Sequence, residues 1–149
     1  MSESKLPDWM QDHLDRYLET NGAEGHLRDF TAAGGKPDTP NLLLTTTGRK
    51  SGKAITLPLI YGTDGSRYVV VGSKGGAPEH PAWYLNLVAQ PQVGVQVADK
   101  KFRAVARTAS GAERQRLWQL MADIYPPYND YRKLTSREIP IVVLEPQVA

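Results

Sequence analysis

The amino-acid sequence predicts a mainly β protein of the α+β class, a six-stranded antiparallel barrel, closed or partly split, with flanking helices. Six short runs rich in Val, Ile, Thr and Tyr lie between residues 41 and 146, each bounded by Gly, Pro, Asp or Lys clusters. Asp64-Gly65 and Ala98-Asp99-Lys100 are tight-hairpin signals between successive runs. Hairpin-linked strands of this length and number are typical of small barrels.

The six predicted strands follow one another along the chain. They are LLLTTTG, AITLPLIYG, SRYVVVGS, QVGVQVA, KFRAVART and EIPIVVLEP. Two predicted helices interrupt them. One covers Pro81–Ala89. The other covers Gly111–Ile124, where Ser110 can cap the N-terminus and apolar residues recur on one face.

Residues 1–40 are predicted to form an N-terminal amphipathic helix followed by a flexible segment. Within Pro7–Thr20, apolar residues recur at helical spacing opposite an acidic face: Trp9, Met10, Leu14, Tyr17 and Leu18. Residues 21–40 hold four glycines and two prolines, which predicts a loop or hinge. The barrel then occupies residues 41–149, and the whole chain is expected to be a single domain.

Length and composition exclude several classes of protein. The 149 residues are 40% hydrophobic and 23% charged, as in an ordinary globular domain. There is no cysteine, which excludes disulfides, thiolate metal sites, iron–sulfur clusters and a cysteine nucleophile. The longest apolar runs are far shorter than the roughly 20 residues that cross a bilayer, and no secretory signal pattern is visible. We therefore expect a cytoplasmic protein.

Charge is unevenly distributed along the chain. Residues 1–30 carry seven acidic and three basic side chains, a net charge of −4. Residues 31–149 carry nine acidic and fifteen basic side chains, a net charge of +6. This basic body suits an anionic partner, which could be nucleic acid, anionic lipid or a phosphorylated small molecule.

The first basic cluster is the predicted hairpin Thr47–Lys53, with the sequence TGRKSGK. Its two glycines free the backbone to present N–H groups, the Ser51 hydroxyl adds a donor, and Arg49, Lys50 and Lys53 supply charge. Together these groups can cradle an anion. The segment is not a Walker phosphate-binding motif, because the GxxxxGK[ST] spacing is absent. The alternative interpretation is a polar hairpin of solvated lysines.

The second cluster, residues 72–78, follows a run of three valines and reads GSKGGAP. Little side-chain bulk at a strand end allows a flat ligand to approach the backbone, and Lys74 can meet an anionic group on it. The alternative is a flexible surface loop. In the helix that follows, Trp83 and Tyr84 point to different faces, so one can pack inward while the other flanks a pocket.

Three tyrosines recur at every third residue in YPPYNDY: Tyr125, Tyr128 and Tyr131. Pro126-Pro127 predicts a turn or irregular segment there instead of a regular helix. Phenols so placed can stack on a planar ligand and donate hydrogen bonds to a substrate oxygen, or they can form a lid that only packs. The histidines show no ligand spacing and no GxSxG elbow occurs, so neither a metal site nor a serine hydrolase is predicted.

These motifs, taken together and in this order, resemble the deazaflavin-dependent nitroreductase family of actinobacteria. The resemblance covers residues 41–146 and is carried by LLLTTTGRKSGK, LPLIYG, VVVGSKGGAPEHPAWYLNLVAQPQVGVQV, YPPYNDY and IPIVVLEP. It implies a split β-barrel related to FMN-binding oxidoreductases, with reduced coenzyme F420 as hydride donor. That coenzyme has a flat deazaflavin ring and an anionic tail, so both basic clusters would face a negative ligand.

The resemblance also implies roles for individual residues. The cofactor-binding set is Arg49, Lys50, Ser51 and Gly52 at the phosphate, Ser73, Lys74 and Gly76 along the ligand, Pro58 and Leu59 on the next strand, and Trp83 and Tyr84 beside the ring. The substrate side holds Ile60, Tyr125, Tyr128 and Tyr131. Two positions depart from the family pattern: Ile55 replaces an arginine that binds phosphate, for which Lys53 is predicted to compensate, and Ile60 replaces a tyrosine near the substrate.

The expected reaction is hydride transfer to a planar electrophile, either a quinone or an activated nitroaromatic. Tyr128 or Tyr131, with the Ser73 hydroxyl, would donate hydrogen bonds to the acceptor oxygen. The alternatives are an FMN enzyme on the same barrel and a nucleic-acid-binding barrel, although the acidic N-terminal helix disfavours nucleic acid. That acidic face also disfavours attachment to the inner face of the plasma membrane. A homo-oligomer is compatible with an open barrel.

Overall fold

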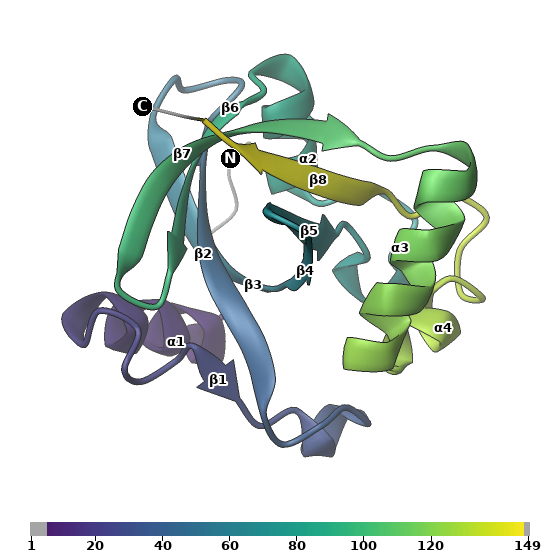
Figure 1. Ribbon diagram of the computed structural model, residues 1–149, viewed down its shortest axis with the longest axis horizontal. Coiled ribbons are helices and arrows are strands. Elements are labelled where there is room, and N and C mark those ends of the chain that lie inside the picture. The colour runs from purple at the N-terminus through teal and green to yellow at the C-terminus, as the bar shows by residue number, and fades with distance from the viewer. Residues whose placement is uncertain (1–5, 148–149) are drawn as a thin grey trace.

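The computed structural model describes residues 6–147, in which one antiparallel sheet curls on itself and carries helices on its outer side (Figure 1). The strands are β1 (Leu27–Arg28), β2 (Thr39–Thr47), β3 (Ala54–Ile60), β4 (Gly62–Asp64), β5 (Arg67–Val71), β6 (Gln92–Val97), β7 (Lys100–Thr108) and β8 (Ile141–Pro146). Their order across the sheet is β1-β2-β6-β7-β8-β5-β4, and β3 pairs with β2. The predicted antiparallel split barrel is confirmed.

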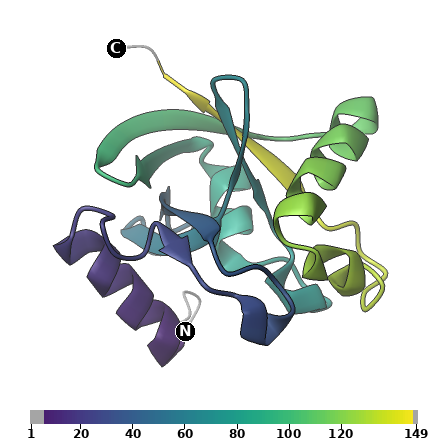
Figure 2. The same ribbon diagram turned by 60° about the horizontal axis from the view of Figure 1, so that its bottom comes forward.

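The helices are α1 (Asp8–Glu19), α2 (Ala82–Ala89), α3 (Gly111–Ile124) and α4 (Pro127–Tyr131), with short 3-10 turns at Thr31–Ala33 and Lys74–Gly76. Figure 2 shows α1 on one side of the barrel and α3 with α4 on the other. None of the helices within residues 6–147 is both long enough and apolar enough to span a bilayer.

All six predicted strands are present, and the sequence analysis missed two short ones. The predicted run 54–62 is broken at Tyr61, where the chain leaves β3 and enters β4, the partner of β5 across the Asp64-Gly65 turn. The segment 21–40, predicted as a loop or hinge, contains β1, which pairs with the beginning of β2. A strand of two residues is too short to show the alternation that identifies strands.

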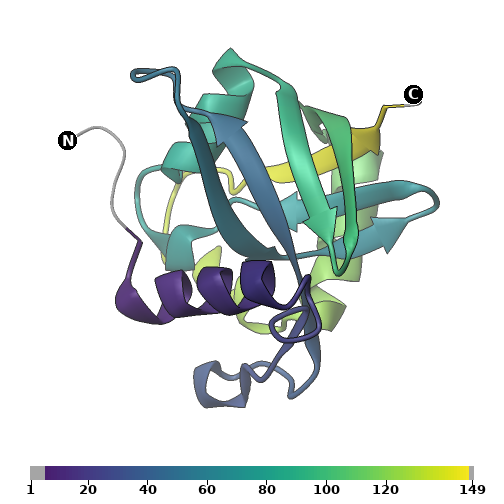
Figure 3. The same ribbon diagram turned by 90° about the vertical axis from the view of Figure 1, so that its left-hand side faces the viewer.

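The barrel is split because β3 is hydrogen-bonded on one side only. It pairs with β2 from Thr47↔Ala54 to Asn41↔Ile60, and within the described chain it has no second strand partner. The chain itself joins β3 to β4, the strand at the other end of the sheet order. Figure 3 shows the β2–β3 hairpin projecting beyond the barrel and α1 lying across its lower end.

Two apolar cores lie on opposite faces of the β5–β8 pair. Val70 and Leu144 face the barrel interior, whereas Val69 and Val143 face α3 and α4. All four side chains are fully buried. Both faces of these strands are therefore covered, which explains why their sequences are continuous apolar runs without alternation.

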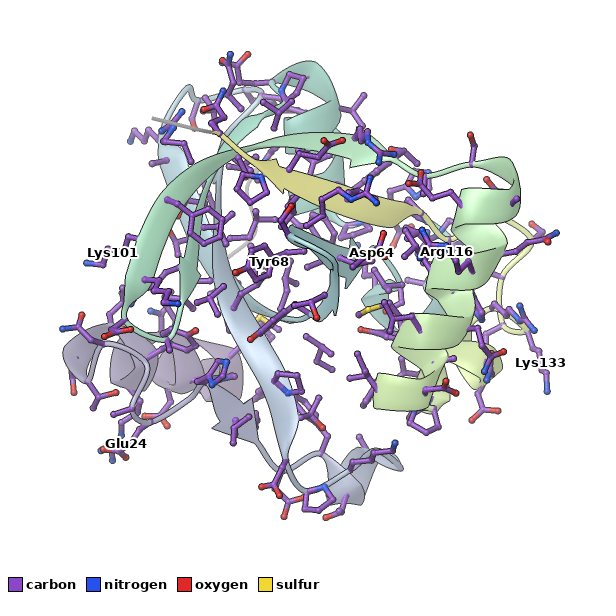
Figure 4. All side chains as sticks on the ribbon, in the orientation of Figure 1. Glu24, Asp64, Tyr68, Lys101, Arg116 and Lys133 are labelled. Carbon is purple, nitrogen blue, oxygen red and sulfur yellow. The ribbon has the colours of Figure 1, made fainter. Side chains whose placement is uncertain are left out.

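An ion-pair cluster attaches α3 to the β4–β5 hairpin. Arg116 donates to both carboxylate oxygens of Asp64, at 2.8 and 3.1 Å, and Arg67 donates to the same carboxylate at 2.9 Å. Figure 4 shows Asp64 and Arg116 side by side at this junction. The contacts hold α3, and with it the following α4, against the barrel.

Two local predictions were wrong. Ser110 stands at the N-cap of α3, but its side chain makes no capping hydrogen bond. Pro126-Pro127 does not prevent a helix, because Pro127 is the first residue of α4. A proline is tolerated at that position, since the first N–H groups of a helix have no intrahelical acceptor.

Helix α1 is held by only part of its predicted apolar face. Trp9 and Leu18 are each 48% exposed, whereas Tyr17 is completely buried. The Tyr17 hydroxyl lies 3.0 Å from the carbonyl oxygen of Asn41 and accepts the N–H of Ala98 at 2.8 Å. Burial raises the pKa of Tyr17 to about 12, so this hydroxyl remains a donor.

Replacement of Tyr17 by Phe removes these bonds while keeping the ring. We expect Tyr17→Phe to lower the free energy of unfolding by about 1–3 kcal/mol, because the partly buried N–H of Ala98 loses its acceptor. Urea denaturation measures the change. Tyr68→Phe is the matched control, because the Tyr68 hydroxyl has no hydrogen-bond partner among the described residues and its ring packs on Tyr61. Equal stability of both variants would show that the Tyr17 hydroxyl does not anchor α1.

Candidate functional site

A cavity of about 700 Å³ lies along the split of the barrel. Its walls come from residues 6–13 at the beginning of α1, residues 28–33, β3, residues 71–75 after β5, the first half of α2, and the tyrosines of the α4 region. Most of the lining side chains are apolar or aromatic. Such a space suits a flat, largely apolar ligand.

The cavity follows the free edge of β3 and not one of its faces. Residues 57–60 all line it, although side chains alternate between faces along a strand. The N–H of Tyr61 donates to the carbonyl oxygen of Pro40, so these two residues form a hydrogen-bonded pair of the β2–β3 ladder. Hydrogen-bonded and non-hydrogen-bonded pairs alternate along an antiparallel ladder, which makes Leu43↔Pro58, three positions further on, a non-hydrogen-bonded pair. The backbone polar atoms of Pro58, Thr56 and Ile60 therefore point away from β2, toward the cavity side.

The structure brings most of the predicted site residues together. Nine of them line the cavity: Pro58, Leu59, Ile60, Ser73, Lys74, Trp83, Tyr125, Tyr128 and Tyr131. Six do not line it: Arg49, Lys50, Ser51, Gly52, Gly76 and Tyr84. Ile55, one of the two positions that depart from the family pattern, also lies in the cavity wall.

The basic hairpin is attached to the cavity rim by Asn86 of α2. The buried side-chain oxygen of Asn86 accepts the backbone N–H of Arg49 at 3.1 Å and its Nη1 at 3.0 Å, and Nδ2 donates to Thr46 at 3.3 Å. Asn86 itself lines the cavity. Arg49 is thus fixed beside the cavity, while Lys50 and Lys53 stay exposed on the projecting hairpin.

The turn after β5 carries Ser73 and Lys74 into the cavity wall. Lys74 has a φ of 47°, a left-handed conformation that costs a side-chain-bearing residue free energy. Its ammonium lies 3.3 Å from Glu79. Gly76 faces α4 instead: a Cβ there would lie 2.8 Å from the carbonyl oxygen of Tyr131, so only glycine fits.

Arg137, which the sequence analysis missed, holds this turn in place. Its guanidinium donates to the carbonyl oxygens of Gly72 at 3.2 Å, Ser73 at 2.8 Å and Ala77 at 2.8 Å. Its Nη1 also lies 3.0 Å from Nδ1 of His80. Arginine must be the donor in this bond, because its side chain has no acceptor. The three bonds to carbonyl oxygens fix the backbone on both sides of Lys74.

The three tyrosines form one aromatic cluster in the wall of the cavity. The hydroxyls of Tyr125 and Tyr131 are 3.0 Å apart, and the rings of Tyr125 and Tyr128 meet edge to face at 4.9 Å. The hydroxyl of Tyr128 has no hydrogen-bond partner among the described residues. Burial raises the pKa of Tyr128, so this phenol stays protonated.

Tyr84 lies outside the cavity. Its hydroxyl is 2.9 Å from Oγ1 of Thr108, and its ring packs on His80. Trp83, its neighbour, is buried in the barrel core and lines the cavity as well. The expectation that these adjacent aromatics take different faces is confirmed.

Asn86 had a detectable sequence signal, whereas Arg137 had none. Asn86 is the one polar residue in the apolar helix AWYLNLVA, and a buried polar residue needs partners. Arg137 bonds to residues 57 to 65 positions earlier in the chain, across no recognisable motif.

This fold defines a split barrel of the FMN-binding-like type, with a mostly apolar cavity along its split. The chain belongs to the F420H(2)-dependent quinone reductase family, whose sequence profile matches residues 9–146. Membership confirms the predicted resemblance and the expectation of a deazaflavin-dependent oxidoreductase that uses coenzyme F420.

Individual relatives agree with this assignment. An F420H(2)-dependent quinone reductase of Mycobacterium tuberculosis is 41% identical over 131 residues, which cover 86% of this chain and 83% of the relative. A solved F420-H2-dependent reductase superposes with a TM-score of 0.67 at 45% identity, over 71% of this chain and 94% of that one. A solved structure described as a domain-swapped dimer superposes with a TM-score of 0.70 at 39% identity, over 93% of this chain and 98% of that one.

The role of Arg137 can be tested by hydrogen exchange. We expect Arg137→Gln to speed hydrogen exchange at the amides of Gly76 and Ala77 by about tenfold or more, because the carbonyl oxygens of the turn lose the guanidinium that holds them. Arg107→Gln is the control. Its side chain binds the carboxylates of Glu113 and Glu145, away from the turn. Unchanged exchange in the Arg137 variant would contradict the assignment.

Proposed function

We propose that this chain transfers a hydride from reduced coenzyme F420 to a quinone bound in the cavity. The observation that carries the proposal is the mixed polarity of the cavity. Its walls are mostly apolar, Lys74 lies in the wall and Arg49 beside it, and the unpartnered, protonated phenol of Tyr128 lines it as well. A ligand pair with an anionic tail, two flat rings and a reducible oxygen fits this combination of groups. The names of the family and of the M. tuberculosis relative support a quinone as acceptor.

The residues present fit the coenzyme. The free edge of β3 offers backbone N–H and C=O groups to the polar rim of a flat ring, and Trp83 and Leu59 offer apolar contact. Arg49, held by Asn86, would bind the phosphate, with Lys50 on the hairpin beyond it. Ser73, Lys74, Ser51 and Gly52 would complete the binding set, as the family pattern implies. When bound, the coenzyme supplies the hydride.

The acceptor would lie between the ring site and the tyrosines. A quinone that takes up one hydride and one proton becomes a hydroquinone, and negative charge develops on its oxygen during transfer. The Tyr128 hydroxyl can donate to that oxygen without breaking an existing bond, whereas Tyr125 and Tyr131 already bond to each other. We therefore assign the donor role to Tyr128, with Tyr131, Ser73 and Ile60 shaping the acceptor site.

Other expectations of the sequence belong to the same proposal. Nitroaromatics are planar electrophiles of similar shape, but the names of the family and of the relative favour a quinone. The domain-swapped dimer found for the 39% identical structure supports a homo-oligomer for this chain.

Charge reversal at the hairpin tests coenzyme binding. We expect Lys50→Glu to raise the Kd for reduced F420 by roughly 10- to 100-fold, as for loss of a charge-assisted contact, and to flatten its salt dependence. Fluorescence titration of the coenzyme measures both. Lys101→Glu is the control, since Lys101 is also exposed but lies on the β6–β7 hairpin, away from α2 (Figure 4). Equal affinities of the two variants for the coenzyme would mean that the hairpin is a solvated turn that does not bind it.

Removal of one phenolic oxygen tests the acceptor site. We expect Tyr128→Phe to lower kcat with a quinone by on the order of 100-fold while the Kd for the coenzyme stays unchanged, because the donor acts on charge that develops only during transfer. Steady-state rates and the same titration measure the two effects. Tyr68→Phe, inside the barrel (Figure 4), should alter neither. Wild-type turnover in the Tyr128 variant would remove this residue from the mechanism.

A further inference from the structure

Arg28 lies in the cavity wall formed by the N-terminal part of the chain. It belongs to β1, which is paired with Thr39 and Pro40 at the beginning of β2. The guanidinium carbon is 4.9 Å from the ring centre of Trp9 and 5.6 Å from that of Phe30. Both rings line the same cavity as Arg28.

This guanidinium lacks a carboxylate partner. Three charged side chains line the cavity within the described residues: Arg28, Asp29 and Lys74. Lys74 is near Glu79, and Asp29 accepts the N–H and the hydroxyl of Thr31 at 2.9 and 2.7 Å. Arg28 has neither an ion pair nor a side-chain hydrogen bond with any described residue. An arginine is always charged, so this wall presents a positive charge with free donors.

The aromatic neighbours leave those donors available. A guanidinium packed against ring faces keeps its in-plane N–H groups for an oxygen ligand. Burial lowers the pKa of the His13 imidazole, which lines the same cavity, and the charge of Arg28 lowers it further. Phe30 also packs edge-on against Tyr125 at 5.6 Å, so the Arg28 wall continues into the tyrosine cluster.

We propose that Arg28 forms an anion subsite at the acceptor end of the cavity, which favours acceptors carrying an ionised oxygen on a planar apolar ring. Trp9 and Phe30 would contact the ring while the guanidinium binds the oxyanion. Hydroxyquinones, which ionise at neutral pH, are acceptors of this chemistry. This inference rests on the proposed quinone reductase function, and it adds a charge preference to it.

The test compares two acceptors of similar size, 2-hydroxy-1,4-naphthoquinone, which is an anion at pH 7, and 2-methyl-1,4-naphthoquinone, which is neutral. We expect Arg28→Gln to lower kcat/KM for the anionic compound by about 10- to 100-fold, the effect of losing a charge-assisted contact, and for the neutral compound by less than about threefold. Arg28→Lys should recover part of the loss. Arg103→Gln, an exposed arginine on β7 outside the cavity, should change neither value.

The outcomes separate a charge effect from a packing effect. An equal loss of kcat/KM with both quinones would mean that Arg28 only supports Trp9 and Phe30, and it would overturn the proposed subsite. No loss of kcat/KM with either quinone would overturn it as well. If the wild-type protein reduces neither quinone, the proposed function fails, and calorimetric titration then decides the subsite. In that case the wild type must bind the hydroxyquinone about tenfold or more tightly than Arg28→Gln does, with no such difference for the methyl compound.

Discussion

The site depends on a strand that is hydrogen-bonded on one side only. An unpaired strand edge normally invites pairing with another chain, and proteins cover or interrupt it. Here Pro58, which has no N–H, stands on that edge, and α1 with the turn after β5 encloses it. The enclosure leaves backbone donors and acceptors beside apolar walls. This combination gives a flat heterocycle both stacking surfaces and polar contacts, and the barrel itself supplies it.

Long-range polar contacts hold the parts of the site in place. Asn86 joins α2 to the β2–β3 hairpin, Arg137 joins the segment before β8 to the turn after β5, and Tyr17 joins α1 to β2 and the β6–β7 turn. In each case a side chain binds backbone atoms, whose positions do not depend on a rotamer. The binding groups are thereby attached to the barrel before any ligand arrives, which lowers the entropic cost of binding.

The Val, Ile, Thr and Tyr content of each run and the turn chemistry between runs were enough to predict the six main strands, since both signals are local. The tyrosine motif was found, but its helix was missed because the position of Pro127 within the helix decides its effect. Arg137 and Arg28 could not be found locally. Their partners are distant in sequence, and their importance comes from which segments the fold brings to the cavity. Motifs therefore predicted cavity-lining residues better than the residues that position them.

The walls of the cavity come from different parts of the chain. The hairpin and the turn after β5, which would hold the coenzyme, belong to the basic body of the protein, whereas Trp9, Arg28 and Phe30 belong to the acidic N-terminal part. Substitutions in residues 6–33 can therefore alter the acceptor wall without disturbing the groups that bind the tail. Such a division lets one barrel keep its reductant while its acceptor changes, because function is determined by the site and not by the fold.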